Sequence, residues 1–395
     1  MADIPEIFKD LKIINPDENV VFCKRCVISN QRPRVNFNTK SVCGQCLYYD
    51  YKHTMVDWDK REKQLEALCD KYRSKDGWWD VIVPGSGGKD SSYVAYTLKE
   101  KFGMHPLMVT WASAIPTDIG QKNLYNFTQS GYDNFLITPN GKTHRKLSKL
   151  AFTELGDNFL PFVYGQLHIP LQVAVKYKIP LIMYGENGEL EYGGSLKNFD
   201  KPTLDPTKFD YVREKLAPSD KPTGPSNWLE YGFEEKDLQI YMPPSLSEIQ
   251  DLGVEYHYFS YYENWSAEKH YEVAKNYVGF QPNPTRSEGT YTNFASLDDK
   301  TDGFHYYMSF IKFGIGRATA DAAHQTRDGI ITRDEGVDLV HKYDGEFPNL
   351  YLDEFLDYMN MDLNALYQTI DKFRRPLIWK KENNEWKLRY QVTKL

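Results

Sequence analysis

Short hydrophobic runs alternate with longer amphipathic stretches from residue 79 to residue 184. Short apolar runs are typical of buried strands, and stretches with apolar residues three or four positions apart are typical of helices. The pattern predicts strands at Val81–Pro84, Pro106–Thr110, Asn134–Thr138 and Leu181–Tyr184, and helices at Ser91–Phe102, Asp118–Ser130, Lys142–Leu155 and Phe162–Tyr177. This alternation predicts a doubly wound parallel α/β sheet, which binds ligands at the carboxyl ends of its strands.

The rest of the chain departs from this rhythm. Residues 57–75 are charged and predict a helix, whereas residues 195–250 are rich in Pro, Lys and Asp and predict an irregular insertion at the mouth of the site. Such a segment is either a lid or a plain surface loop, and the sequence leaves both open. A strand-like aromatic run follows at Val254–Tyr262, and helices dominate from residue 266. We expect four parts: residues 1–56, 57–194, 195–250 and 251–395.

A glycine-rich turn joins the first predicted strand of the sheet to its helix. It comprises Gly85, Ser86, Gly87, Gly88, Lys89, Asp90, Ser91 and Ser92. Glycines let successive backbone N–H groups point at one anion, and the helix adds its positive end. Lys89 adds a cation, the serines add hydroxyls, and Asp90 can face a magnesium ion. The string lacks the Walker pattern and resembles the pyrophosphatase loop of enzymes that split ATP into AMP and pyrophosphate; the alternative is a turn that binds nothing.

Four of the five cysteines form two C-x-x-C pairs, with 16 residues between the pairs. Their spacing predicts a zinc ribbon in which Cys23, Cys26, Cys43 and Cys46 hold one structural Zn²⁺. A disulfide or redox pair is the weaker interpretation. All four positions around the ion are then filled by protein, so the metal has no catalytic role. The fifth cysteine, Cys69, lies in a predicted amphipathic helix and is expected to be a small buried hydrophobe.

An acidic, glycine-flanked segment follows the strand Leu181–Tyr184. Its carboxylates Glu186, Glu189 and Glu191 lie where the sheet is expected to bind ligands. They could hold Mg²⁺ beside the phosphates, steer an ammonia nucleophile or accept substrate hydroxyls. The alternative is a solvated acidic turn.

A small-residue segment, 312–324, predicts a helix on which Arg317, Asp321 and His324 share one face. Arg317 near the phosphate loop would neutralise charge on leaving pyrophosphate. An ordinary ion pair between Arg317 and Asp321 is an equal alternative. His168 is either a substrate contact or a structural histidine.

Composition limits the partners. The chain has 395 residues, 41% of them hydrophobic, which suits a globular protein of two or three parts. The formal net charge of −7 argues against a general nucleic-acid binder, which carries a basic face. Neither an apolar run of membrane-spanning length nor a signal peptide is apparent. We expect a cytoplasmic protein.

With these motifs in view, the chain resembles the bacterial N-acetyl sugar amidotransferases, which make acetamidino sugars in pseudaminic-acid and O-antigen synthesis. The resemblance runs from the cysteine pairs to near the C-terminus. It includes the glycine-rich loop and the strings at 109–111, 117–120, 161–166, 184–194, 313–319, 327–329 and 332–333. No motif is broken, and residues 195–250 are the part without a counterpart.

The resemblance implies a reaction and a set of site residues. An acetamido oxygen is adenylated by ATP, ammonia attacks the carbon, and AMP leaves. Lys89, Asp90, Glu186, Glu189 and Arg317 would be catalytic. The loop residues 85–92 with Thr110 and Trp111 would bind ATP and Mg²⁺. Residues that would contact a free or nucleotide-linked acetamido sugar are Tyr164, Gln166, Asn187, Glu191 and Tyr192.

No cysteine carries a glutaminase signature, so the resemblance implies that a separate glutaminase subunit supplies ammonia. Two alternatives remain in view. A tRNA thiolase also joins a zinc ribbon to a pyrophosphatase loop, but the net charge of −7 and the lack of spare catalytic cysteines disfavour it. A nucleotide sensor without activity would not need Lys89, Asp90 and the acidic segment.

Overall fold

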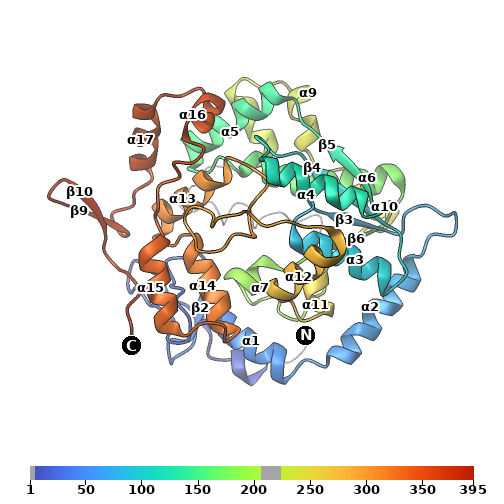
Figure 1. The fold of residues 1–395 in the computed structure, drawn as a ribbon, viewed down its shortest axis with the longest axis horizontal. Helices are drawn as coiled ribbons and strands as arrows, with labels where there is room; N and C mark the ends of the chain where they lie inside the picture. Colours follow the sequence, from blue (N-terminus) through green and yellow to red (C-terminus); the bar gives the residue numbers. More distant parts are fainter. Residues whose placement is uncertain (1–4, 206–223) are drawn as a thin grey trace.

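The computed structural model describes residues 5–205 and 224–395. At its centre lies a six-stranded sheet in the order β5-β4-β3-β6-β8-β7 (Figure 1). Its strands are β3 (Val81–Pro84), β4 (Pro106–Trp111), β5 (Asp133–Ile137), β6 (Leu181–Tyr184), β7 (Thr203–Leu204) and β8 (Glu255–Tyr258). Neighbouring strands are parallel except that β7 pairs antiparallel with β8. The predicted doubly wound parallel sheet is confirmed.

The order of the strands creates a switch point between β3 and β6. The chain runs from β3 outward to β4 and β5, and then returns to place β6 on the other side of β3, where Ile82 pairs with Ile182. Loops that leave two such strands diverge and open a crevice at their carboxyl ends. The glycine-rich loop follows β3 and the acidic segment follows β6, so the two lie at this crevice.

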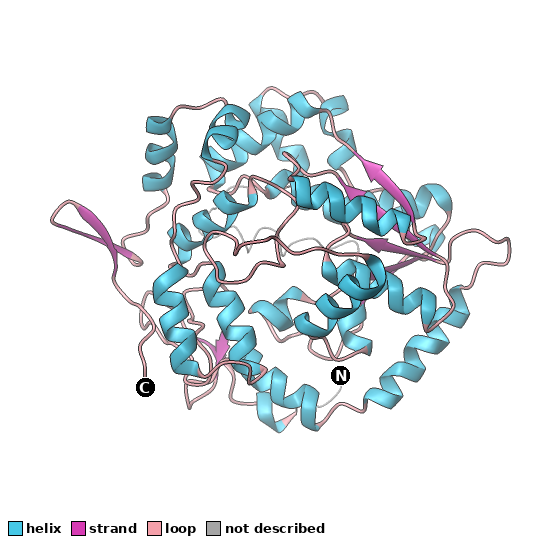
Figure 2. Cartoon of the chain, in the orientation of Figure 1, coloured by secondary structure: helices cyan, strands magenta, loops and turns pink. Residues whose placement is uncertain are grey.

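Helices cover both faces of the sheet (Figure 2). Alternate side chains of β3 point to opposite faces, so Val81 and Val83 join one core and Ile82 the other. The first core contains residues of α2 (Trp58–Tyr72), α3 (Lys89–Glu100), α4 (Asp118–Gln129) and α11 (Phe259–Tyr262). The second contains residues of α5 (Gly141–Leu155) and α6 (Leu160–Tyr177). The predicted helices are confirmed with ends shifted by a few residues.

The predicted irregular insertion is partly helical. It holds η2 (Pro225–Tyr231), α9 (Glu235–Leu238), η3 (Gln239–Tyr241) and α10 (Leu246–Leu252). Trp228, Tyr241 and Ile249 are buried in the core on the α6 side of the sheet. These residues stabilise the domain, whereas residues 206–223 of the predicted lid lie outside the described residues.

The cysteine-containing segment packs beside the sheet domain. It holds η1 (Glu6–Phe8), β1 (Lys12–Ile13), β2 (Asn36–Phe37) and α1 (Gly44–Thr54). Helix α1 begins directly after Cys43 and packs against α7 (Gly188–Tyr192), the short helix of the acidic segment.

The C-terminal part is mainly helical, as predicted, and from residue 302 onward it lies at the left of Figure 1. Its elements are α12 (Ala267–Val273), η4 (Ala274–Val278), α13 (Asp302–Phe313), α14 (Arg317–Arg327), α15 (Arg333–Tyr343), α16 (Leu352–Met359), α17 (Leu363–Lys372), β9 (Trp379–Glu382) and β10 (Glu385–Leu388).

Two predictions about this part were wrong. The single helix over 312–324 is two helices, because Gly314 has φ +66° and ends α13, and Gly316 precedes α14. The aromatic run Val254–Tyr262 is a strand only to Tyr258 and then turns into α11. In residues 5–205 and 224–395, no helix has both the length and the hydropathy needed to cross a bilayer.

Candidate active site

The glycine-rich loop requires its glycines. A Cβ at Gly85 would lie 2.2 Å from Cβ of Ser91, and Gly87 has φ +81°, with a Cβ position 2.9 Å from Cα of Leu124. Gly88 caps α3 without a side-chain hydrogen bond, so the first N–H groups of a 12-residue helix face the loop. Such groups together with the helix dipole favour an anion. The loop therefore has the geometry of a phosphate cradle.

Lys89 and Asp90 form an ion pair at the start of α3, with 2.5 Å between Lys89 Nζ and Asp90 Oδ2. The other Asp90 oxygen accepts a hydrogen bond from Nδ1 of His270, which lies 2.8 Å away on α12. The His270 ring stacks on Tyr93, with 4.0 Å between centroids. Burial opposes ionisation of Asp90, but Lys89 and His270 outweigh it and lower its pKa. The carboxylate is thus ionised and held in one orientation.

The loop serines lie beside this pair. The Ser91 hydroxyl donates to the Gly88 carbonyl at 3.2 Å. The Ser92 hydroxyl is buried and has no hydrogen-bond partner among the described residues. Ser86 is half-buried in the turn.

Thr110, on strand β4, contacts the backbone of the glycine-rich loop. Its buried hydroxyl lies 2.7 Å from the Gly85 carbonyl oxygen and 2.8 Å from Oδ1 of Asn134. Thr110 thus positions the loop backbone.

Two of the predicted ligand contacts lie in the core instead of at the crevice. Trp111 is 5% exposed and packs against α6, where a Cβ on Gly165 would lie 2.1 Å from the indole. Tyr164 is 2% exposed, and its hydroxyl accepts a hydrogen bond from Trp228 Nε1 at 3.1 Å. Both belong to the core, so the roles predicted for them in binding ATP and sugar do not agree with their positions. Gln166 is half-buried on α6.

His168 is also buried in the core, where its ring Nδ1 lies 2.5 Å from the Tyr241 carbonyl oxygen. Of the two interpretations of this histidine, the structure supports the structural one.

The acidic segment turns toward the glycine-rich loop. Burial and the nearby Asp90 carboxylate raise the pKa of Glu186 to about 7. Asn187 caps α7 by accepting a hydrogen bond from the Glu189 N–H at 3.1 Å. Glu189 forms an ion pair with Arg34 at 2.6 Å. The Glu186 carboxylate therefore lies close enough to Lys89 and Asp90 for their charges to act on it.

Glu191 is not available as a sugar contact. Its oxygens lie 2.9 and 3.1 Å from Nζ of Lys52 on α1, and the two side chains are 6% and 5% exposed. The neighbouring Tyr192 lies edge-on to His324, with 4.8 Å between ring centroids. The ion pair between Lys52 and Glu191 attaches the acidic segment to the cysteine-containing segment.

Further hydrogen bonds strengthen this attachment. Gln45 Nε2 donates to the carbonyls of Glu189 and Gly194 at 3.1 and 3.2 Å, and Arg32 Nε donates to Gly193 at 3.1 Å. The cysteine-containing segment thus holds the acidic segment in place from three points.

Arginines gather beside the acidic segment. Burial and the nearby Arg34 lower the pKa of Arg32 to about 10, because like charges disfavour one another. Arg317 lies 3.4 Å from Asp321, donates to the Ser296 hydroxyl at 2.6 Å and lies over the ring of Tyr306. The predicted ion pair between Arg317 and Asp321 is confirmed.

The four paired cysteines converge, with their sulfur atoms all within 4.8 Å of one another. Cys23 and Cys46 sulfurs are 3.8 Å apart, and Cys26 and Cys43 sulfurs 3.7 Å. A tetrahedron with Zn–S bonds of about 2.3 Å has edges of about 3.8 Å, so these thiolates fit one zinc ion. The cluster is fully buried, which agrees with a closed structural site.

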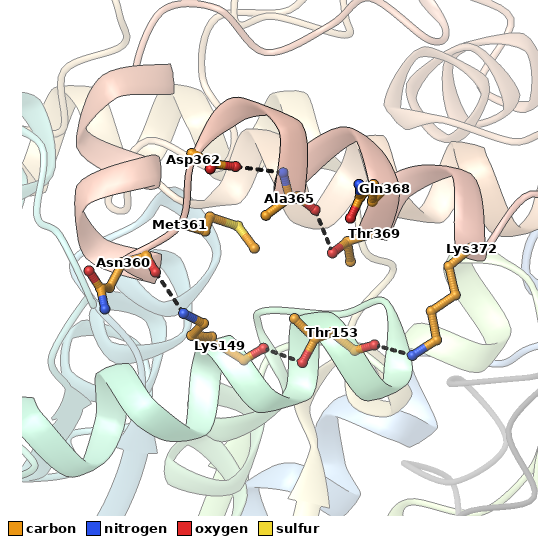
Figure 3. Close-up of a pocket in the computed structure, with 9 residues that line it drawn as sticks. All are labelled: Lys149, Thr153, Asn360, Met361, Asp362, Ala365, Gln368, Thr369 and Lys372. Carbon is orange, nitrogen blue, oxygen red and sulfur yellow. Dashed lines mark hydrogen bonds between the residues drawn. The ribbon is translucent and has the colours of Figure 1, made fainter.

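A cavity lies away from the crevice, lined by residues of α5 and α17. It has a volume of about 520 Å³ and runs between α5 and α17 (Figure 3). Its lysines already bind backbone, Lys149 at the Asn360 carbonyl (2.6 Å) and Lys372 at the Thr153 carbonyl (2.7 Å). This cavity contains none of the predicted site residues and is a gap in the packing between α5 and α17.

Sequence reasoning missed His270, Lys52 and Arg32. Each reaches the site from a segment far away in the chain, and none lies in a motif. The only available signal was their type, because a histidine or a basic residue near an acidic site is a plausible partner.

Comparison with known proteins gives two sequence matches. A family model described as the C-terminal domain of LPS biosynthesis protein WbpG-like proteins matches residues 288–393. An uncharacterised protein of Methanocaldococcus jannaschii, MJ1599, is 32% identical over 92 residues, which are 22% of this chain and 31% of that protein. The C-terminal part of the chain is thus similar to that of LPS biosynthesis proteins, and the alignment with MJ1599 spans about a third of that relative.

Two solved structures show weak likeness. The U34-tRNA thiolase NcsA from Methanococcus maripaludis, solved with its [4Fe-4S] cluster, is 14% identical with a TM-score of 0.30, over 69% of this chain and 78% of that one. NMN synthetase from Francisella tularensis is 13% identical with a TM-score of 0.25, over 54% and 96%.

Proposed function

We propose that the protein is an ATP-dependent amidotransferase that converts the N-acetyl group of a bacterial surface sugar into an acetamidino group. The observation that carries the proposal is the switch-point crevice, where the glycine-rich loop with Lys89 and Asp90 faces the acidic segment with Glu186. The match of residues 288–393 to an LPS biosynthesis domain supports a sugar substrate.

The chemistry proceeds in two steps. The amide oxygen of the sugar attacks the α-phosphorus of ATP, and the bond to pyrophosphate breaks. Ammonia then adds to the imidoyl carbon and loses a proton, and the C–O bond to AMP breaks to leave the amidine. Adenylation is needed because an amide carbon is a poor electrophile and an amide oxygen a poor leaving group.

Each residue of the crevice has its own proposed role in the two steps. The loop N–H groups and Lys89 stabilise charge on the phosphates, and Arg317 does so on leaving pyrophosphate. Asp90, oriented by His270, would hold a magnesium ion that neutralises phosphate charge. Glu186 accepts the proton from the attacking nitrogen, since a base with a pKa of about 7 is matched to neutral pH. Glu189 is engaged by Arg34, so it shapes the segment.

Ammonia must come from elsewhere. All five cysteines lie in described residues; four form the metal cluster, and burial raises the pKa of the fifth, Cys69, to about 12. A thiol with such a pKa is a poor nucleophile, which disfavours both an internal glutaminase and a sulfur-transfer reaction at Cys69. We propose a separate glutaminase subunit as the source.

One experiment tests the proposal directly. Purified protein is incubated with ATP, Mg²⁺, ammonium and a panel of free and nucleotide-linked acetamido sugars. Mass spectrometry should show exchange of O for NH in one sugar, with AMP and pyrophosphate released. Formation of ADP, or turnover with glutamine by the lone chain, would contradict the proposal.

A further inference from the structure

A second cavity lies behind the acidic segment, between α1, α7 and α14. Tyr49 and the exposed Asp328 lie at its outer end, and Trp265 and His324 at its inner end. Its free space for the centre of a water-sized molecule is about 10 Å³, which is room for one small molecule.

Two buried nitrogens at the inner end have no hydrogen-bond partner among the described residues, Nε2 of His324 and Nε1 of Trp265. Both side chains are 8% exposed. Unpartnered polar atoms are costly in a protein interior, so an occupant that can both donate and accept hydrogen bonds is expected here. Burial and the nearby cations, Arg327 first among them, keep the His324 ring neutral by holding its pKa well below 6.5.

Trp265 lines this cavity and also lies close to the phosphate loop. Its ring lies 5.1 Å from the ring of His324, and Nζ of Lys89 lies 5.7 Å from the centre of the same ring. The same tryptophan lies edge-on to His270, the partner of Asp90, at 5.7 Å. The Trp265 side chain thus links the lining of the cavity to residues of the proposed adenylation site.

We propose that this cavity is the entry route for ammonia, an inference that rests on the proposed amidotransferase function. Ammonia matches the space, and it can donate to one nitrogen and accept from another. Lys52 and Arg327 in the wall are matched by Glu191 and Asp328, so burial and not the charge of the wall disfavours ammonium. The molecule therefore enters as neutral NH₃ and leaves its proton to solvent at the outer end. A sugar or a nucleotide is too large for this space.

The test separates ammonia entry from adenylation. Sugar-dependent ATP–pyrophosphate exchange without ammonia reports adenylation, and amidine formation at varied ammonium reports entry. Asp328→Trp, which obstructs the outer end, should leave exchange intact and raise the half-saturating ammonium concentration at least about tenfold. Asp334→Trp, the same change at an exposed position of α15, is the matched control and should leave both unchanged.

A second variant tests the route by a gain of activity, so its result cannot be explained by loss of folded protein. His324→Ala enlarges the cavity and should raise amidine formation from methylamine, relative to ammonia, by about 10- to 200-fold over the wild type, the range that one carbon is worth in a tight pocket. Unchanged ammonium saturation in Asp328→Trp together with unchanged methylamine use in His324→Ala would overturn the route and leave the amidotransferase proposal standing. Absence of sugar-dependent exchange in the wild type would overturn both.

Discussion

Removal of the buried cation Lys52 should destabilise the protein strongly. Lys52 Nζ contacts both oxygens of Glu191, at 2.9 and 3.1 Å, and neither side chain is more than 6% exposed. Lys52→Met leaves the Glu191 carboxylate buried without its partner, which costs about 3–5 kcal/mol. With an unfolding entropy of about 2.1 cal/mol/K per residue over 395 residues, Tm should fall by roughly 4–6 °C.

Thermal unfolding followed by circular dichroism measures this shift. The matched control is Lys101→Met, because Lys101 and Glu62 form an ion pair of 2.5 Å whose side chains are about half exposed. That change should cost less than about 1 kcal/mol. The double variant Lys52→Met with Glu191→Leu should recover most of the lost stability, since no unpaired charge remains.

The result that would refute this reasoning is equal Tm shifts in Lys52→Met and Lys101→Met. The two pairs would then be equivalent, and the pair at Glu191 would not be the buried link between the cysteine-containing segment and the acidic segment. A double variant no more stable than Lys52→Met would also contradict it.

Three further predictions concern the metal and the crevice. Protein purified without chelator should contain one zinc ion per chain by metal analysis, and Cys43→Ser should lower Tm and solubility because a closed site contributes folding energy; a zinc-free, fully stable protein would contradict this. Lys89→Ala should reduce AMP formation at least about a hundredfold in protein that circular dichroism shows to be folded at the assay temperature, as expected for lost stabilisation of phosphate charge. Because burial and Asp90 raise the pKa of Glu186 to about 7, its carboxylate is protonated below that pH; sugar-dependent turnover at a fixed concentration of free NH₃ should rise through pH 7 in the wild type and not in Glu186→Gln.

The chain's local patterns predicted much of the fold. Strand Val81–Pro84 and strand Leu181–Tyr184 have the predicted bounds, and the glycine-rich loop stands between strand and helix as expected. These features could be predicted because hydrophobic period and glycine conformation are local properties. The convergence of the four cysteines was predicted for the same reason, since each pair forms its own turn.

Local patterns failed where burial was decided by distant neighbours. Trp111 follows a predicted strand, which placed it near the expected crevice, and the family resemblance gave Tyr164 as a sugar contact. Nevertheless α6 and Trp228 enclose both side chains in the core. The helix predicted through Gly314 is interrupted because that residue takes φ +66°.

The sequence by itself determined the parallel sheet, the glycine-rich loop and the cluster of four cysteines, because each depends on residues that are close in the chain. Only the tertiary structure decided which charges meet. It brings His270 to Asp90, Lys52 to Glu191 and Trp265 to Lys89. Such contacts join residues up to 180 positions apart, and no period or motif in the chain encodes them. Their cause is the packing of α1, α12 and α14 around the crevice, which fixes the environment of every charge in the site.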